Sequence, residues 1–193
     1  MAEYPNWFVS TGAVNNFERH LRHLAGEPVH FLQIGAYTGD ASKWMLEQIL
    51  SHPDSTLTDV DTWQGSDEDA HHEMDFQDVF KTYLEKVEGH HNLISHRETS
   101  KDFFDDNYHM YDFIYIDGDH TAFGVMRDLI SAYGSLKPGG IIACDDYQWT
   151  EGKGNFYDPR PAIDAFFNMT RDRMQVIEIG WQVWFKDATQ TTA

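Results

Sequence analysis

Aspartates follow two apolar segments of this sequence, at the point where each segment ends. Segment 111–116 leads into Asp117, and segment 139–144 leads into Asp145 and Asp146. Apolar runs rich in β-branched and aromatic residues are typical of buried parallel strands, which deliver the residues that follow them to one edge of a sheet. We therefore expect the three carboxylates to share a crevice. Crowded carboxylates repel one another and offer only oxygen ligands, so they favour Mg²⁺, Mn²⁺ or Ca²⁺ over Zn²⁺.

A structural role is the alternative for each of these aspartates taken singly. Aspartate after a strand often forms a turn or caps a helix, because its side chain accepts hydrogen bonds from nearby backbone N–H groups. Three aspartates after two core-like segments favour a metal site over three separate turns.

Glycines mark the turn after an earlier apolar segment, 29–35. Gly35 and Gly39 flank this turn, and a helical pattern over 40–50 follows it. The first strand-to-helix turn of an open α/β sheet binds nucleotides, and glycine lets such a ligand lie against the backbone. The spacing lacks the middle glycine of G-x-G-x-x-G, which disfavours NAD as the ligand.

Two acidic residues near the end of the next apolar segment, 55–61, are candidates for binding a ribose. A carboxylate at this position can accept hydrogen bonds from both ribose hydroxyls of an adenosine ligand. We favour Asp61 over Asp59, because alternation along a strand places Asp61 at its tip. Trp63 either offers an aromatic surface to the ligand or closes the edge of the core.

Helical and strand patterns alternate along the chain and must position these residues. Residue patterns predict strands over 29–35, 55–61, 92–96, 112–116 and 139–144, and helices over 14–24, 40–50, 74–87, 101–105, 122–133 and 161–169. The run 175–185 alternates around a glycine, which predicts a hairpin. Strands separated by helices indicate an α/β fold with a doubly wound, mostly parallel sheet and an antiparallel hairpin at its C-terminal end.

Length and composition indicate one domain over residues 1–193, with a helical N-terminal segment, 1–26. The chain is 41% hydrophobic and shows no break in composition. Its formal net charge of −18 repels phosphate backbones and anionic lipids, which argues against nucleic-acid and membrane-surface partners. The N-terminus lacks a secretory pattern, no apolar run is long enough for a membrane span, and Cys144 is the only cysteine. These features favour a cytoplasmic protein, and they are compatible with a homo-oligomer.

Taken in order over residues 31–185, these motifs resemble the class I S-adenosylmethionine-dependent methyltransferases, whose sheet is seven-stranded and Rossmann-like. Within that class the chain is similar to the metal-dependent O-methyltransferases, such as the catechol, caffeoyl-CoA and macrolide sugar enzymes. The resemblance implies S-adenosyl-L-methionine as cofactor, a small-molecule hydroxyl as methyl acceptor, and Mg²⁺ or Mn²⁺ held by Asp117, Asp145 and Asp146. The cofactor site that it implies consists of Gln33, Gly35, Ala36, Tyr37, Thr38, Gly39, Asp61, Thr62, Trp63, Ser100 and Asp117. Many relatives have an acid at the position of Gln33.

The resemblance also implies a general base three residues beyond the first metal-binding aspartate, which is His120 here. Methyl transfer to oxygen requires the acceptor hydroxyl to lose its proton, and a neutral imidazole can take that proton near pH 7. With Asp117 it forms the expected catalytic pair. The alternative is a residue beside a helix N-cap without a catalytic duty. His71 and His72 lie in a charged segment, and we assign them no metal.

Two segments are candidates for covering the site. Segment 147–158 combines glycines with aromatic residues, and Trp7 and Phe8 lie near the N-terminus. Two other functions are compatible with the same motifs. One is a metal-independent methyltransferase, and the other is a non-catalytic module that binds adenosine nucleosides.

Overall fold

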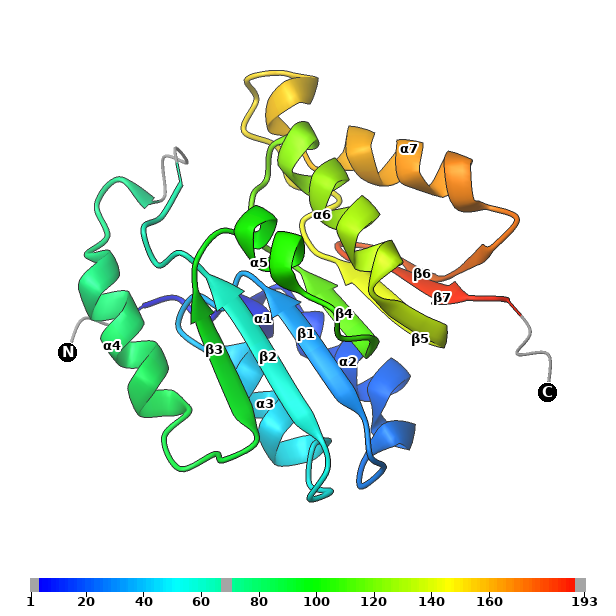
Figure 1. Cartoon of the computed structure of the whole chain (residues 1–193). Helices are drawn as coiled ribbons and strands as arrows, with labels where there is room; N and C mark the ends of the chain where they lie inside the picture. The colour runs from blue at the N-terminus through cyan, green and yellow to red at the C-terminus, as the bar shows by residue number, and fades with distance from the viewer. Residues whose placement is uncertain (1–3, 67–70, 190–193) are drawn as a thin grey trace.

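A seven-stranded mixed sheet with helices on both faces forms the molecule, as Figure 1 shows for the computed structural model, which describes residues 4–66 and 71–189. The strands are β1 (His30–Ile34), β2 (Thr56–Asp61), β3 (Leu93–Arg97), β4 (Tyr111–Ile116), β5 (Leu136–Cys144), β6 (Met174–Ile179) and β7 (Val183–Asp187). Their order in the sheet is β3-β2-β1-β4-β5-β7-β6, and only the pairs formed by β7 are antiparallel. The expected doubly wound sheet with its C-terminal hairpin is confirmed.

Among the described residues, two helices precede β1, and five others connect the successive strands from β1 to β6. They are α1 (Trp7–Ser10), α2 (Ala13–Leu21), α3 (Asp40–Gln48), α4 (Phe76–Lys86), α5 (Ser100–Asp106), α6 (Ala122–Gly134) and α7 (Arg160–Thr170), with short 3₁₀ turns η1 (Arg22–Leu24) and η3 (Asn155–Tyr157). Side-chain caps start several of them: Thr99 caps α5 and Thr121 caps α6 by accepting hydrogen bonds from backbone N–H groups. No helix in the described part of the chain is both long and apolar enough to cross a membrane.

Two apolar cores fill the spaces between the sheet and its two helical layers (Figure 1). Alternate residues of each central strand supply them, because successive side chains of a strand point to opposite faces. Phe113 of β4 packs with α1 to α4, whereas Ile114 packs with α5 to α7. Burial on both faces explains why these strands are almost continuously apolar in sequence.

Most expected elements agree with the structure within a few residues, and the differences lie near the N-terminus. The expected helix 14–24 is split into α2 and the 3₁₀ turn η1. The short helix α1 was not expected, since four residues carry no periodic signal. The expected polar stretch after β2 continues beyond the described residues at 67–69, and residues 1–3 of the N-terminal segment also lie outside them.

The carboxyl ends of β1 and β4 touch through their backbones at Gly35. This glycine has a φ of +85°, and a Cβ added to it would lie 1.9 Å from the carbonyl oxygen of Asp117. Glycine is therefore required at this position both by its backbone conformation and by the space available. The contact determines how closely the glycine turn approaches Asp117.

A second constraint on the same edge is Asp59, which is fully buried on β2. The hydroxyl of Tyr83 in α4 donates a hydrogen bond to Asp59 Oδ2 at 2.9 Å and lies 2.6 Å from Ser95 Oγ on β3. Burial raises the pKa of Asp59 to about 7, although the hydroxyls of Ser42 and Tyr83 act in the opposite direction. The fold thus contains a carboxyl group that is destabilising when it is ionised.

Substitution of Gly35 by alanine should destabilise the protein. We expect Gly35→Ala to lower the free energy of unfolding by at least about 2 kcal/mol, since the left-handed backbone and the contact with Asp117 both oppose a Cβ. Denaturant unfolding measures the change. Gly134→Ala is the matched control, because no atom lies within 4 Å of its added Cβ, and it should be neutral or mildly stabilising. Equal stability of Gly35→Ala and wild type would contradict this assignment.

The raised pKa of Asp59 predicts a pH-dependent difference between wild type and Asp59→Asn. The folded-state pKa of about 7 exceeds the unfolded value near 3.8, so wild type loses stability as pH rises through this window. Asp59→Asn should therefore be more stable than wild type at pH 8, by on the order of a few kcal/mol, and similar near pH 4. Urea unfolding at both pH values tests this. Asp54→Asn is the control, because its carboxylate is exposed, and a constant difference for Asp59→Asn would refute the prediction.

Candidate active site

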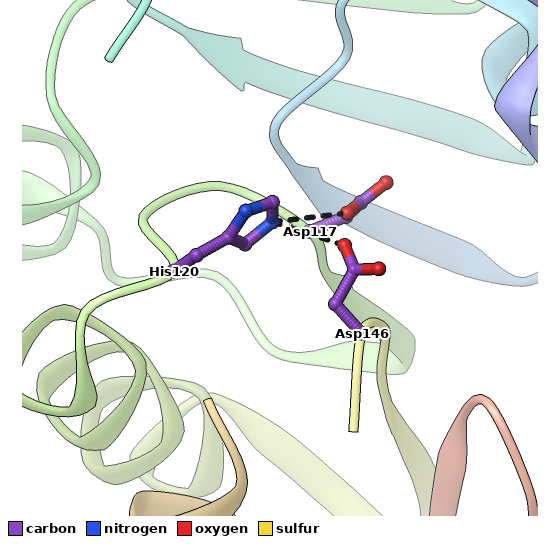
Figure 2. Close-up of side chains that lie close together, drawn as sticks. All are labelled: Asp117, His120 and Asp146. Carbon is purple, nitrogen blue, oxygen red and sulfur yellow. Dashed lines mark ion pairs between the residues drawn. The ribbon is translucent and has the colours of Figure 1, made fainter. Parts of the chain in front are cut away.

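An imidazole and two carboxylates face one another where β4 and β5 end. His120 comes from the loop between β4 and α6, and Figure 2 shows its ring directed at Asp117 and Asp146. His120 Nε2 lies 3.1 Å from Asp146 Oδ2 and 3.7 Å from Asp117 Oδ1. One ligand atom from each residue lies within 4.8 Å of the others, so the three residues could surround one ion. Asp146 reaches this position with a φ of +56°, a conformation that few residues other than glycine adopt.

Asp145 lies beside this group but is bonded to other partners. Its Oδ1 accepts a hydrogen bond from the backbone N–H of Asp146 at 2.8 Å. Its Oδ2 accepts one from Gln182 Nε2 at 3.1 Å and a very short one from the hydroxyl of Tyr115. The same hydroxyl lies 3.2 Å from Asp117 Oδ2. Of the three aspartates expected at a metal, the structure therefore places Asp117 and Asp146 with His120, and Asp145 behind them.

The carboxylates of this centre destabilise one another's charges. Burial, and then the charge of Asp145, raises the pKa of Asp117 well above its usual range, although His120 acts against this. Burial and the adjacent charge of Asp146 raise the pKa of Asp145 to about 6. A divalent cation would relieve this repulsion, and the carboxylate oxygens of Asp117 and Asp146 are the kind of ligand that suits Mg²⁺ or Mn²⁺. The residues present therefore fit a cation.

The glycine turn after β1 lines a pocket next to this centre. Its walls consist of Trp7, Phe8, Gln33, Gly35, Ala36, Tyr37, Asp40, Ala41, Tyr115 and Asp117. Gln33 shapes the turn, because its amide donates to the carbonyl of Gly35 at 2.8 Å and accepts a hydrogen bond from Ser42 at 3.2 Å. Of the residues expected at a cofactor, Gln33, Gly35, Ala36, Tyr37 and Asp117 all line this pocket.

Asp61 holds the glycine turn in place. Its Oδ2 accepts hydrogen bonds from the backbone N–H groups of Ala36 at 2.8 Å and Tyr37 at 2.9 Å, and its Oδ1 accepts one from Trp63 at 2.7 Å. A carboxylate has about four acceptor positions, so one remains for a ligand hydroxyl. Asp59 is buried beneath α4, which leaves Asp61 as the acid of β2 that lies next to the turn.

Other residues expected at the cofactor direct their side chains elsewhere. The ring of Trp63 is buried against Phe80 and Tyr83, which answers the question left open by the sequence in favour of the core. Thr38 is buried and bonded to Asp40. The remaining three occupy structural positions: Thr62 Oγ1 accepts from the backbone N–H of Gln64, Ser100 donates to Asp128, and Gly39 is the N-cap of α3.

The N-terminal segment covers the pocket. The ring of Trp7 stacks on Tyr37 with 4.8 Å between ring centroids, and Asn6 donates to Asp40 at 3.0 Å. Phe8 is buried and packs edge-on against Phe17 of α2. The expectation that Trp7 and Phe8 lie at the site is consistent with these contacts.

Segment 147–158, the other candidate cover, borders the acidic centre. The ring of Trp149 lies 5.1 Å from that of His120, and Phe156 lies 5.5 Å from Phe123 at the start of α6. Phe123 is 74% exposed and Phe156 is 50% exposed. Segment 147–158 thus contacts both His120 and the exposed ring of Phe123.

Three residues at the centre were missed by the sequence analysis: Tyr115, Trp181 and Gln182. Tyr115 precedes Asp117 by two positions on β4, so strand alternation alone could have placed both on one face. Trp181 and Gln182 lie in the turn of the hairpin, far from the aspartates in sequence. Only the pairing of β5 with β7 brings them together.

Comparisons with known proteins identify the fold. The sequence matches the family model of a methyltransferase domain over residues 32–147, and no curated protein matches it. The structure resembles the O-methyltransferase TomG from Streptomyces achromogenes, involved in tomaymycin synthesis and solved with S-adenosylmethionine. The two are 13% identical over 98% of this chain and 92% of that chain, with a TM-score of 0.63.

Two further structures show the range of this likeness. The O-methyltransferase from Bacillus cereus, solved with S-adenosylhomocysteine, is 16% identical over 93% of this chain and 88% of that chain, with a TM-score of 0.59. A structure of the fibrillarin/Nop5p complex is 13% identical over 83% and 72% of the respective chains, with a TM-score of 0.56. At such identities the likeness concerns the fold. Because the family model spans more than half of the sequence, the chain belongs to the methyltransferase domain family, with the fold of the class I S-adenosylmethionine-dependent enzymes.

Proposed function

We propose that this methyltransferase uses S-adenosylmethionine and a divalent cation to methylate a hydroxyl group of a small molecule. The observation that carries the proposal is the position of Asp117. This residue lines the pocket of the glycine turn and also belongs to the acidic centre with His120 and Asp146. A cofactor in the pocket and an acceptor at the acidic centre would therefore both lie next to the carboxylate of Asp117.

The pocket supports an adenosine-type cofactor. Asp61 holds the turn through two backbone N–H groups and retains one acceptor position, which suits a ribose hydroxyl. The turn lacks the middle glycine that a dinucleotide needs. Two of the structural neighbours were solved with S-adenosylmethionine or S-adenosylhomocysteine, which agrees with this choice.

The acidic centre supports a bound cation. Asp117 and Asp146 would supply oxygen ligands, while Asp145 lies beside them with its Oδ2 bonded to Tyr115 and Gln182. When bound, S-adenosylmethionine supplies the methyl group on a sulfonium, and the cation supplies positive charge that favours the ionised form of the acceptor hydroxyl. The residues themselves orient the acceptor and accept its proton.

His120 is placed to act as the general base. Its Nε2 faces the carboxylates of Asp117 and Asp146, so an acceptor hydroxyl between them would lie within reach of the imidazole. These carboxylates favour the protonated ring that results. Trp149 packs beside the imidazole and restricts access of water to it.

The electrostatics favour a small-molecule acceptor over a nucleic acid. The net charge of −18 opposes binding of a phosphate backbone, and the aromatic ring of Trp149 packs beside His120. Flat or apolar hydroxyl compounds suit such a surface. The likeness to fibrillarin is one of fold and does not by itself assign an RNA substrate.

Methyl transfer from S-adenosylmethionine to a panel of catechols, phenols and sugars tests the proposal. We expect transfer in the presence of Mg²⁺ or Mn²⁺, its loss after chelation and its return when the ion is restored. Calorimetry with S-adenosylhomocysteine measures cofactor binding separately. Full activity in excess chelator would indicate a metal-independent methyltransferase. Cofactor binding without transfer to any acceptor would indicate a nucleoside-binding module.

Replacement of His120 should separate catalysis from binding. We expect His120→Ala to lower the rate of methyl transfer by roughly 10²–10⁴, because a positioned base is removed. The wild-type rate should rise with pH as the imidazole loses its proton, and the variant should lack this rise. His109→Ala, at an exposed position, is the control. If His120→Ala instead loses its affinity for Mn²⁺, the imidazole is a ligand, and the assignment as base is wrong.

A further inference from the structure

We infer that the turn of the C-terminal hairpin, residues 180–182, holds the Asp145–Asp146 pair in the geometry needed to bind the cation. In this inference, which rests on the proposed function, Trp181 and Gln182 are positioning residues. Neither belongs to the group formed by Asp117, His120 and Asp146. Each of them instead donates a hydrogen bond to one of the two consecutive aspartates.

The register of the sheet brings the turn to the aspartates. Strands β5 and β7 are antiparallel, and their pairing ends with Cys144 opposite Val183. Beyond this pair, the same register places Asp145 opposite Gln182 and Asp146 opposite Trp181. A backbone hydrogen bond of 2.9 Å from the N–H of Tyr147 to the carbonyl of Trp181 continues the pairing beyond the last ladder residue.

Trp181 holds the side chain of Asp146. Its indole Nε1 donates to Asp146 Oδ1 at 3.1 Å, which leaves Oδ2 to face His120 at 3.1 Å. Asp146 adopts a left-handed backbone conformation, which costs free energy and persists only when neighbouring contacts stabilise it. The indole contact holds the side chain of Asp146, and the hydrogen bond from Tyr147 to Trp181 holds the backbone that follows it.

Gln182 holds Asp145, and its orientation follows from its partners. The side chain is fully buried, and its Oε1 lies 3.0 Å from Trp184 Nε1 and 3.0 Å from Asn16 Nδ2. An indole N–H can only donate, so the amide oxygen must face Trp184 and the amide nitrogen must face Asp145. Gln182 Nε2 accordingly donates to Asp145 Oδ2 at 3.1 Å.

Tyr115 extends this arrangement to the third aspartate. Its hydroxyl is within reach of Asp145 Oδ2 and Asp117 Oδ2, yet it has one proton and can donate to only one carboxylate at a time. Gln182 Nε2 lies 3.4 Å from the same hydroxyl oxygen. The turn therefore acts on Asp146 directly, on Asp145 directly, and on Asp117 through Tyr115. Loss of a donor that fixes a metal-binding carboxylate commonly lowers metal affinity by 10- to 100-fold.

Calorimetric titration of the whole chain with Mn²⁺ tests the inference without relying on turnover. Trp181→Phe removes the indole donor and keeps an aromatic ring, and Gln182→Met removes both polar groups at similar volume. We expect each variant to lower Mn²⁺ affinity by roughly 10- to 100-fold and to reduce the rise in Tm that Mn²⁺ causes. The affinity for S-adenosylhomocysteine should stay within about twofold of the wild-type value. In the methyl-transfer assay, the decrease in kcat should exceed the change in the KM for the cofactor.

Matched controls isolate the hydrogen bonds from general effects on the fold. Gln175→Met makes the same change at an exposed position of β6, and Trp44→Phe makes the same change in α3, where the ring packs against Phe8 and Phe17. Both should bind Mn²⁺ as wild type does. Trp181 is at the surface, with 36% of its area exposed, so Trp181→Phe decides the question even if Gln182→Met fails to fold.

The outcomes separate the inference from the proposed function. If wild type and Trp181→Phe bind Mn²⁺ equally well, the inference is overturned and the proposed function stands. If Trp181→Phe binds more weakly while S-adenosylhomocysteine affinity is retained, the inference is supported. A wild type that binds neither Mn²⁺ nor Mg²⁺ removes the cation from the proposed function and overturns the inference with it.

Discussion

Repulsion among partly buried carboxylates at the ends of β4 and β5 is the constraint on which the arrangement of this site depends. Burial and the nearby negative charges raise the pKa values of Asp117 and Asp145, so an isolated cluster of this kind would take up protons or move apart. The structure surrounds it with donors instead. The phenol of Tyr115, the amide of Gln182 and the indole of Trp181 contact the three aspartates, and His120 faces two of them.

The same edge of the sheet also carries the pocket, and one backbone contact joins the two. Gly35 allows the turn after β1 to lie against the carbonyl of Asp117, which no residue with a Cβ would permit. Asp61 then fixes the turn from the side of β2. These contacts come from the ends of β1, β2 and β4, so the geometry of the pocket depends on the sheet order that places β1 between β2 and β4.

The N-terminal segment depends on tertiary contacts for its conformation. A helix of four residues is far too short to be stable alone, because nucleation of a helix is unfavourable and few hydrogen bonds follow it. Trp7 stacks on Tyr37, Phe8 is buried against Phe17, and Asn6 both caps α1 and donates to Asp40. The conformation of the N-terminal cover therefore depends on its contacts with the residues that lie beneath it.

What the sequence determined by itself follows from periodicity and local chemistry. Continuous apolar runs ending in aspartates indicated β4 and β5, alternating runs indicated the hairpin, and the glycine spacing argued against a dinucleotide. These signals are local, since side-chain alternation and turn preferences act over a few residues. They sufficed for the sheet and for the edge that carries Asp117, Asp145 and Asp146, whereas the role expected of His120 came from the resemblance to a family. Tertiary structure decided the rest, because it depended on contacts between segments distant in sequence. The ring of Trp63 entered the core, Asp145 turned toward Tyr115, and Gln182 reached Asp145 across 37 residues through antiparallel pairing that no local pattern encodes.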